Sequence, residues 1–257
     1  MRVARGRGRY ARVQLRGMST SRVYISLLFG TISAGCTAAP ASVSQFGGIR
    51  EVMRDGQVES RIALAEVTRK PHAHAIGALQ GLAGEVTILD GQVWVARASG
   101  ENLKVSGPDP VASDSATLLT VAHVPKWIPI RLQGATAGVD LAATIERSAR
   151  AAGIDVDRPF PFQVEGELTA LDLHVVRGAC PSGATEENSP WRRSLNEPVE
   201  ATLAGFFAKH EEGTMTHHGT SLHMHALLRR GGEMLTGHVD RVSLAPGALL
   251  SLPEDHR

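Results

Sequence analysis

The sequence predicts an α/β chain of the α+β type that is rich in β-strands, with mixed or antiparallel sheets and one main central helix. Two segments with glycine-containing hairpin turns, residues 84–96 and 221–242, and one amphipathic helical segment, residues 140–153, lead to this prediction. Tight hairpin turns need positive φ angles, which glycine adopts at little cost. The composition, 42% hydrophobic and 21% charged, is ordinary for a globular protein.

The N-terminal end of the chain has the features of an export signal. Residues 1–50 contain eight arginines and no acidic residue. The apolar run at residues 23–32 is shorter than the roughly 20 residues that span a bilayer, and it leads to small residues before Cys36. Ala34-Gly35-Cys36 is similar to a bacterial lipobox, in which the cysteine becomes the lipidated first residue. An ordinary secretory signal and an organellar transit peptide are the alternatives.

We therefore predict an exported protein, a periplasmic or outer-membrane lipoprotein or alternatively a secreted one, whose only membrane contact is a lipid anchor at Cys36. Without the seven arginines of residues 1–35, 20 of the 27 basic residues remain against 26 acidic ones, which argues against a nucleic-acid partner. The predicted organisation is a signal peptide at 1–35 with Met18 as an alternative start, a flexible tether at 36–47, and a folded domain at 48–257 that the sequence leaves open to division near 133–158.

Short strands and turns are predicted through most of the folded domain. The expected helix at residues 140–153 begins with Asp140 as its cap and ends at Gly153. The segment 133–158 that contains it is expected to cross between two sheet regions. The other expected elements are a short helix at 49–55, strands at 61–67, 115–122, 128–132, 159–176 and 199–207, and loops at 97–114 and 181–196.

The first hairpin is predicted from Asp90-Gly91, a strong turn pair between two β-prone runs. Its register places Val86 opposite Val95 and gives the hairpin one wholly apolar face. Glu85 falls on the other face, beside Thr87. A carboxylate at the start of a strand is usually only solvated, so this pattern alone assigns Glu85 no role.

The second hairpin brings three histidines onto one face. With Gly231-Gly232 as the two-residue loop, His225 stands opposite His238, and His223 shares their face because side chains alternate along a strand. Three neutral imidazoles suit Zn²⁺ or another divalent transition metal, and three protein ligands leave a position open for water or substrate. The residues thus predict an open metal site, although isolated histidines are more often surface or core groups.

Other histidines are weaker candidates for metal binding. His217 and His218 precede the strand and are interpreted as loop residues or as residues that support the ligands. His72 and His74 form a second H-x-H pattern, but no third ligand follows at hairpin spacing.

The order of these motifs resembles the α-acetolactate decarboxylase family. The resemblance rests on G-E-V-T-I-L-D-G, the central helix, F-P-F-Q-V-E-G, H-H-G-T-S-L-H-M-H and G-H-V-D, and it covers about residues 46–253. It implies the family's two-sheet arrangement and zinc held by His223, His225 and His238, the trio that the hairpin register selects independently. It also implies a catalytic role for Glu85.

Two features depart from the family pattern. The resemblance implies a catalytic arginine at the position of Gln163, and glutamine can donate a hydrogen bond but supplies no charge. It also implies a glutamate in a C-terminal tail beyond the last sheet, whereas this sequence stops at Leu252-Pro253-Glu254-Asp255-His256-Arg257. We therefore predict a divergent member in which Gln163 occupies the arginine's place.

The resemblance implies a small oxo-acid substrate, 2-acetolactate, which loses CO₂ to give acetoin. Zinc would act as a Lewis acid on the developing negative charge, and Glu85 would handle the proton. One alternative is a divergent zinc-dependent lyase or hydrolase acting on another small oxo-acid or ester. The other is a non-catalytic metal-binding lipoprotein, and a homodimer is left open.

Overall fold

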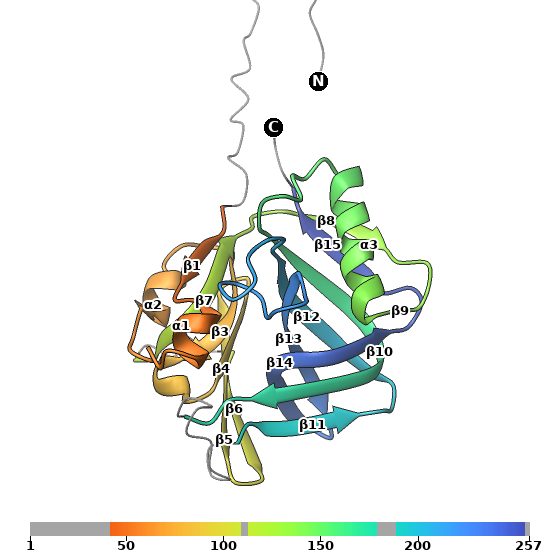
Figure 1. Cartoon of the computed structure of the whole chain (residues 1–257). Coiled ribbons are helices and arrows are strands. Elements are labelled where there is room, and N and C mark those ends of the chain that lie inside the picture. The colour runs from red at the N-terminus through yellow and green to blue at the C-terminus, as the bar shows by residue number, and fades with distance from the viewer. Residues whose placement is uncertain (1–41, 109–112, 179–188, 255–257) are drawn as a thin grey trace, which may run out of the picture. The chain divides into compact units, whose positions relative to one another are not determined.

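The structure, a computed structural model, describes residues 42–108, 113–178 and 189–254, all of which belong to one compact unit, Thr37–Arg257. The expected signal peptide and Cys36 lie outside the described residues. Within these ranges the chain forms two antiparallel sheets and one main helix, which confirms the predicted β-rich fold class (Figure 1). None of the described helices is long and apolar enough to cross a membrane.

The first sheet contains the strands from the first half of the chain, in the order β1-β7-β3-β4-β5-β6 with β2 paired to β7. Its strands are β1 (Ser44–Phe46), β2 (Ile62–Ala63), β3 (Ala73–Leu79), β4 (Glu85–Leu89), β5 (Gln92–Ser99), β6 (Asn102–Ser106) and β7 (Ser115–His123). The β4–β5 turn has positive φ at both Asp90 and Gly91, 48° and 79°. The turn therefore produces the predicted register, with Val86 opposite Val95.

The second sheet follows in the order β8-β15-β10-β12-β13-β14-β9, with β11 paired to β10. Its strands are β8 (Trp127–Arg131), β9 (Thr136–Ala137), β10 (Phe160–Val175), β11 (Trp191–Leu195), β12 (Val199–Phe207), β13 (Leu222–Arg230), β14 (Glu233–Leu244) and β15 (Leu249–Pro253). The first half of β10 pairs with β12 and its second half pairs with β14. This double pairing closes β10, β12, β13 and β14 into a small barrel.

Irregularities in β10 change which of its residues point into the barrel. In the first half the buried side chains are Phe160, Phe162 and Val164, at even positions; in the second half Leu173 and Val175, at odd positions, are buried. The pairing with β14 shifts register between Leu168 and Ala170 and between Asp172 and Leu173. An extra residue in a strand reverses the alternation that follows it. The outer face of β10 therefore changes from odd to even positions.

The main helix, α3 (Gly138–Ala151), packs against the barrel. Its Leu141, Ile145 and Ala149 are fully buried in the same hydrophobic cluster as the barrel side chains. The helix begins two residues before the expected start, so Asp140 lies in the first turn. There its negative charge interacts favourably with the helix dipole and stabilises the helix. Gly153 follows the helix with φ of 83°, a conformation that glycine tolerates at a helix end. The shorter helices are α1 (Ile49–Met53), α2 (Leu64–Val67) and a 3₁₀ turn, η1 (Gln80–Leu82).

Several predicted elements differ from the structure. Residues 61–67 were expected to form one strand, but only β2 is extended and α2 follows, since Leu64 and Val67, one helical turn apart, are both buried. The expected loops at 97–114 and 181–196 contain β6 and β11, which lie at sheet edges and have polar, partly exposed sequences typical of loops.

Two boundaries also differ. Ser44–Phe46, assigned to the tether from the sequence, forms β1. The chain leaves the first sheet after β7 and enters the second at β8, earlier than the expected crossing at residues 133–158. These residues contain β9 and the expected helix, α3.

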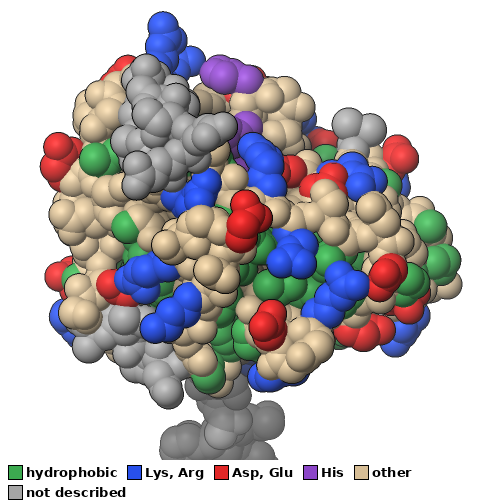
Figure 2. Space-filling model, turned by 90° about the horizontal axis from the view of Figure 1, so that it is seen from below, with side chains coloured by type: hydrophobic (Ala, Val, Ile, Leu, Met, Phe, Trp, Pro, Cys, Tyr) green, Lys and Arg blue, Asp and Glu red, His purple; other side chains and the backbone are tan. Residues whose placement is uncertain are grey.

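The two sheets pack together through β3 and β4 on one side and β12, β13 and β14 on the other. Ile76 and Ala122 of the first sheet share a buried cluster with Ala204 and Phe206 of the second. At this interface the polar side chains of β4 reach the histidine hairpin, and the candidate site is there. On the face shown in Figure 2, basic and acidic side chains are interspersed rather than gathered into a patch of one sign.

Candidate metal centre

The three histidines of the β13–β14 hairpin lie together, in the register that the glycine turn predicts. Gly231 and Gly232 have φ of 58° and 86°, and His225 stands directly opposite His238. The ring centroids are 5.1 Å apart for His223 and His238, 5.6 Å for His223 and His225, and 5.8 Å for His225 and His238. Each residue offers a ring nitrogen that lies within 4.8 Å of the other two.

The chemistry of this trio fits a divalent transition metal. His223, His225 and His238 are 3%, 0% and 9% exposed, and two buried nitrogens, His223 Nδ1 and His225 Nε2, have no hydrogen-bond partner. Burial lowers the pKa of His223 to about 3 and those of His225 and His238 well below the ordinary value. The rings are therefore neutral, the form that binds metals. Unpartnered buried nitrogens are costly, and metal coordination would offset that cost.

A hydroxyl pair from two different strands orients one ligand. With Nε2 of His225 free for a metal, Nδ1 carries the proton and donates it to Thr87 Oγ1 on β4, 3.0 Å away. Thr87 in turn lies 2.8 Å from Thr236 Oγ1 on β14. Partners of this kind fix the tautomer and the ring orientation of a metal-binding histidine.

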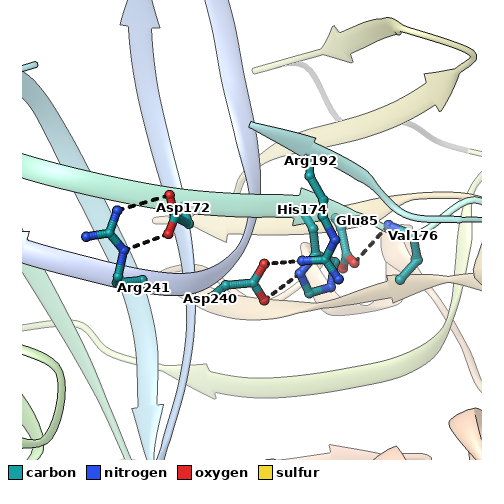
Figure 3. Close-up of polar contacts among 7 residues, drawn as sticks. All are labelled: Glu85, Asp172, His174, Val176, Arg192, Asp240 and Arg241. Atoms are coloured by element: carbon teal, nitrogen blue, oxygen red, sulfur yellow. Dashed lines mark hydrogen bonds and ion pairs between the residues drawn. The ribbon is translucent and has the colours of Figure 1, made fainter. Parts of the chain in front are cut away.

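Glu85 approaches the trio from β4. Its Oε2 lies 3.6 Å from His225 Nε2, and the backbone N–H of Val176 donates to its Oε1 at 3.4 Å (Figure 3). Burial raises the pKa of Glu85 to about 8, opposed by the Val176 hydrogen bond and supported by the charge of Asp240. The carboxyl group therefore holds a proton at neutral pH. The structure thus brings together the three histidines that the hairpin register grouped and Glu85, which only the family resemblance added to them.

Gln163 is not brought to the site. It lies on β10 opposite Ala204, which lies opposite His225, so two strand spacings, about 10 Å, separate the backbones of Gln163 and His225. Its side-chain amide donates to Glu165 of the same strand. Its position shares the sheet face of His225, and its described hydrogen bond is to Glu165, so the role that the resemblance implies for this position stays a prediction.

The residue of β10 that does reach the trio is His174. It stands opposite His238, with ring centroids 4.8 Å apart, and its Nδ1 donates to Asp240 Oδ1 at 2.8 Å. Arg192 Nη1 donates to Asp240 Oδ2 at 2.7 Å (Figure 3). Sequence reasoning missed His174, although its place between Leu173 and Val175, both apolar and buried, marks it as an outward residue.

A cavity opens beside these groups. Its polar lining consists of Glu85, His174, His217, His223 and His238. One wall is apolar and comes from α1, η1, the first sheet and the residue after β10; it includes Ile49, Met53, Leu82, Leu118 and Val176. The lining contains no arginine or lysine among the described residues.

The four other histidines that the sequence singled out have different surroundings. His217 lies in the loop between β12 and β13 and lines the cavity, with its ring centroid 5.2 Å from that of His238; burial lowers its pKa. His218 instead contacts Glu212 at 3.4 Å. The second H-x-H pair separates, because His72 contacts Asp90 at 2.8 Å while His74 is buried between the rings of Trp127 and Phe206.

Comparison with known proteins places the chain in a family. The family model described as alpha-acetolactate decarboxylase matches residues 44–250. No curated protein matches the sequence.

Solved structures share the fold at low sequence identity. Alpha-acetolactate decarboxylase from Bacillus subtilis strain 168 is 15% identical, with a TM-score of 0.65 over 82% of this chain and 85% of that chain. Acetolactate decarboxylase from Bacillus subtilis subspecies spizizenii is 14% identical, with the same TM-score and coverage. A Staphylococcus aureus protein of unknown function, similar to alpha-acetolactate decarboxylase, is 16% identical, with a TM-score of 0.61 over 82% of this chain and 84% of that chain. Since the family model spans most of the chain, this protein belongs to the alpha-acetolactate decarboxylase family.

Proposed function

We propose that this protein is a zinc-dependent carboxy-lyase that converts 2-acetolactate, a 2-hydroxy-3-oxo acid, to acetoin and CO₂. The observation that carries the proposal is the buried trio His223, His225 and His238, which has unpartnered nitrogens on His223 and His225 and lies beside a cavity that Glu85 also lines. Membership of the family supports the class of reaction.

The groups around the cavity match what this decarboxylation needs. When the bond between the carboxylate carbon and C2 breaks, its electron pair moves toward the ketone and negative charge develops on the ketone oxygen. A divalent ion held by the trio would supply Lewis-acid stabilisation of that charge. Glu85 holds the proton that the carbon takes up after CO₂ leaves. The apolar wall excludes water and strengthens these electrostatic interactions.

The direct test is the formation of acetoin from 2-acetolactate by the purified, zinc-loaded protein. We expect a His225→Ala variant to lose both bound zinc and acetoin formation. A His72→Ala variant is the matched control, because His72 is exposed and contacts Asp90 instead of the trio. A wild-type protein that binds zinc but forms no acetoin above the His225→Ala background would contradict the proposal.

A second candidate is a zinc-dependent lyase or hydrolase that acts on another small oxo-acid or ester. The lining of the cavity favours the ester, since an ester has no carboxylate and no described lining residue is an arginine or lysine that could pair with one. Turnover of another oxo-acid or ester by zinc-loaded protein that is inactive on 2-acetolactate would select this candidate.

We also propose export and lipid anchoring at Cys36, supported by the arginine-rich start, the short apolar run and Ala34-Gly35-Cys36. Expression in a bacterium with labelled palmitate tests the anchor. The sequence has one other cysteine, Cys180. We expect label in the wild type and in a Cys180→Ser variant but none in a Cys36→Ser variant. Label that is absent from the wild type would reject the anchor.

A further inference from the structure

His174 is a fourth imidazole at the cavity, and it is not part of the metal-binding trio. It lies on β10 opposite His238, one strand away from the hairpin that carries the trio, and it lines the cavity. The nitrogens that lie within 4.8 Å of one another belong to His223, His225 and His238. His174 therefore stands beside the position where a ligand of the metal would lie.

Two neighbours hold the ring of His174 in one orientation. Asp240 accepts the Nδ1–H of His174 at 2.8 Å through one oxygen and a guanidinium N–H of Arg192 at 2.7 Å through the other. Arg192 lies opposite His174 on β11, and Asp240 lies two residues beyond His238 on β14, so three paired strands supply this group (Figure 3). Because Asp240 uses both oxygens, the ring is held from behind, as a carboxylate holds the histidine of a catalytic triad.

This arrangement determines which atom of His174 is available to a ligand. A carboxylate is only an acceptor, so Nδ1 carries the proton that it donates to Asp240. In the neutral ring Nε2 is then an acceptor, and it lies on the side of the ring away from Asp240. The carboxylate and the ketone of a 2-hydroxy-3-oxo acid are also only acceptors. Its hydroxyl group is the one donor that Nε2 can accept.

We propose that Nε2 of His174 accepts a hydrogen bond from the hydroxyl group of a 2-hydroxy acid bound against the trio. Asp240 and Arg192 are positioning residues that act through the ring. This contact deepens the function proposed above, and rests on it for the identity of the substrate. It makes His174 a determinant of specificity, because an acid without the hydroxyl group leaves Nε2 unpartnered.

Two conservative variants separate the ligand contact from a structural role. In His174→Asn the side-chain amide replaces Nδ1, so it keeps the bond to Asp240 and loses the acceptor toward the cavity. In His174→Gln the amide reaches the place of Nε2, so it keeps an acceptor there. The probes are two acids that differ only in the hydroxyl group: 2-hydroxy-2-methylpropanoate and 2-methylpropanoate.

Binding of both probes to the zinc-loaded protein is measured by calorimetry, with zinc content measured in every variant. We expect His174→Asn to weaken the binding of the hydroxy acid about 10-fold, as the loss of one hydrogen bond predicts. The affinity for 2-methylpropanoate should stay at the wild-type value. His174→Gln should bind the hydroxy acid within about 3-fold of the wild type. Zinc content should stay at the wild-type level in both variants.

The positioning role of Asp240 has its own comparison. Asp240→Asn should weaken the binding of the hydroxy acid and leave that of 2-methylpropanoate unchanged. An amide can donate as well as accept, so it no longer enforces the His174 tautomer with the proton on Nδ1. Asp172→Asn is the matched control, since Asp172 lies on β10 two residues before His174 and accepts two bonds from Arg241 at the surface (Figure 3). It should bind both acids as the wild type does. Equal effects of the two substitutions would overturn the positioning role.

Several results would overturn the proposal as a whole. If His174→Asn weakened the binding of both acids equally, His174 would contact the carboxylate group that they share. If the variant lost zinc, His174 would be a metal ligand. If the Asn and Gln variants lost affinity for the hydroxy acid equally, or if the wild type did not bind it more tightly than 2-methylpropanoate, the role of the His174 ring would be packing alone. A wild type that prefers the hydroxy acid through His174 but forms no acetoin would reject the proposed function alone.

Discussion

Glu85 shows how position in the fold changes the chemistry of a residue. At the start of a polar hairpin face it would be an ordinary solvated carboxylate, but the second sheet covers it and leaves it 4% exposed. Burial raises its pKa to about 8, so its carboxyl group beside the trio holds a proton at neutral pH. The proposed role of Glu85 thus depends on contacts between distant parts of the chain.

Glu85→Gln should lower kcat for acetoin formation by a factor of about 100 to 10,000, since the amide keeps the shape but supplies no proton to carbon. Zinc content should remain at the wild-type level. Glu167→Gln, an exposed substitution on β10, is the control and should leave kcat unchanged. Steady-state kinetics with parallel metal analysis makes the comparison, and a kcat for Glu85→Gln within about 3-fold of the wild type would refute the role.

Thr87→Val should weaken zinc binding about 10- to 100-fold, because the N–H of His225 loses its buried acceptor. Thr87→Ser should restore the wild-type affinity by restoring the hydroxyl group. Thr117→Val controls for the loss of a buried hydroxyl elsewhere in the first sheet, where Thr117 donates to the carbonyl of Gln57. Competition with a chelator measures the affinities, and equal affinity in Thr87→Val and Thr117→Val would contradict the expectation.

The sequence predicted the parts of the site that local chemistry determines. His225 and His238 face each other because Gly231-Gly232 fixes the turn, and that register can be counted from the sequence. The approach of Glu85 to the trio followed only from the family resemblance. His174 was missed, because β10 reverses its alternation within the strand and the reversal depends on the pairing with β14.

Among the helices and strands, too, those determined by neighbouring residues were predicted, and those determined by pairing with other segments were not. Both glycine hairpins and α3 formed where turn and cap residues predicted them, within two residues. The edge strand β11 was expected to be a loop because its pairing partner, β10, lies beyond an intervening segment of the chain. β6 pairs with the adjacent β5, but its mixed polar sequence does not show the alternation of a strand. The backbone partners of a 16-residue strand such as β10 are likewise not contained in its own sequence.

The close approach of β10 and β14 at the site depends on a glycine. A Cβ added at Gly237 would lie 2.6 Å from the carbonyl oxygen of His174, so Gly237→Ala must push the two strands apart. We expect it to lower the free energy of unfolding by about 1–3 kcal/mol and to weaken zinc binding by displacing His238. Urea unfolding of the zinc-free protein and chelator competition of the loaded protein measure the two effects.

Gly134→Ala is the matched control for this substitution. A Cβ at Gly134 would have no neighbour within 4 Å, and its φ is not in the positive range that disfavours alanine. It should leave both stability and zinc affinity at the wild-type level. If Gly237→Ala has the same free energy of unfolding and zinc affinity as Gly134→Ala, the close contact between β10 and β14 contributes nothing to either quantity.

At the scale of the whole molecule, His74 couples the packing of the two sheets to pH. It is 1% exposed at their interface, and burial lowers its pKa to about 4. In the unfolded chain an ordinary histidine has a pKa of about 6.5, so between pH 6.5 and 4 the unfolded state binds a proton that the folded state does not. Stability associated with His74 is therefore present above pH 6.5 and falls by about 1.4 kcal/mol per pH unit as the pH drops toward 4.

His74→Leu should remove this contribution. Urea unfolding of the zinc-free wild type and variant at pH 7.5 and pH 5 gives the four free energies needed. The loss between the two pH values should be about 2 kcal/mol smaller in the variant than in the wild type, with the comparison at pH 7.5 correcting for the change in packing. Equal losses in both proteins would mean that His74 is protonated in the folded state.

The double pairing of β10 has a consequence for the order in which the site is built. During synthesis the first half of β10 finds its partner when β12 emerges, but the second half has none in the barrel until β14 is made. His174 and Asp240, 66 residues apart, meet across the seam that closes last. Contacts between distant segments form late because the intervening chain must first be ordered. A ligand in the cavity that contacts both β10 and β14 can therefore bind only after these two strands have paired and the barrel has closed.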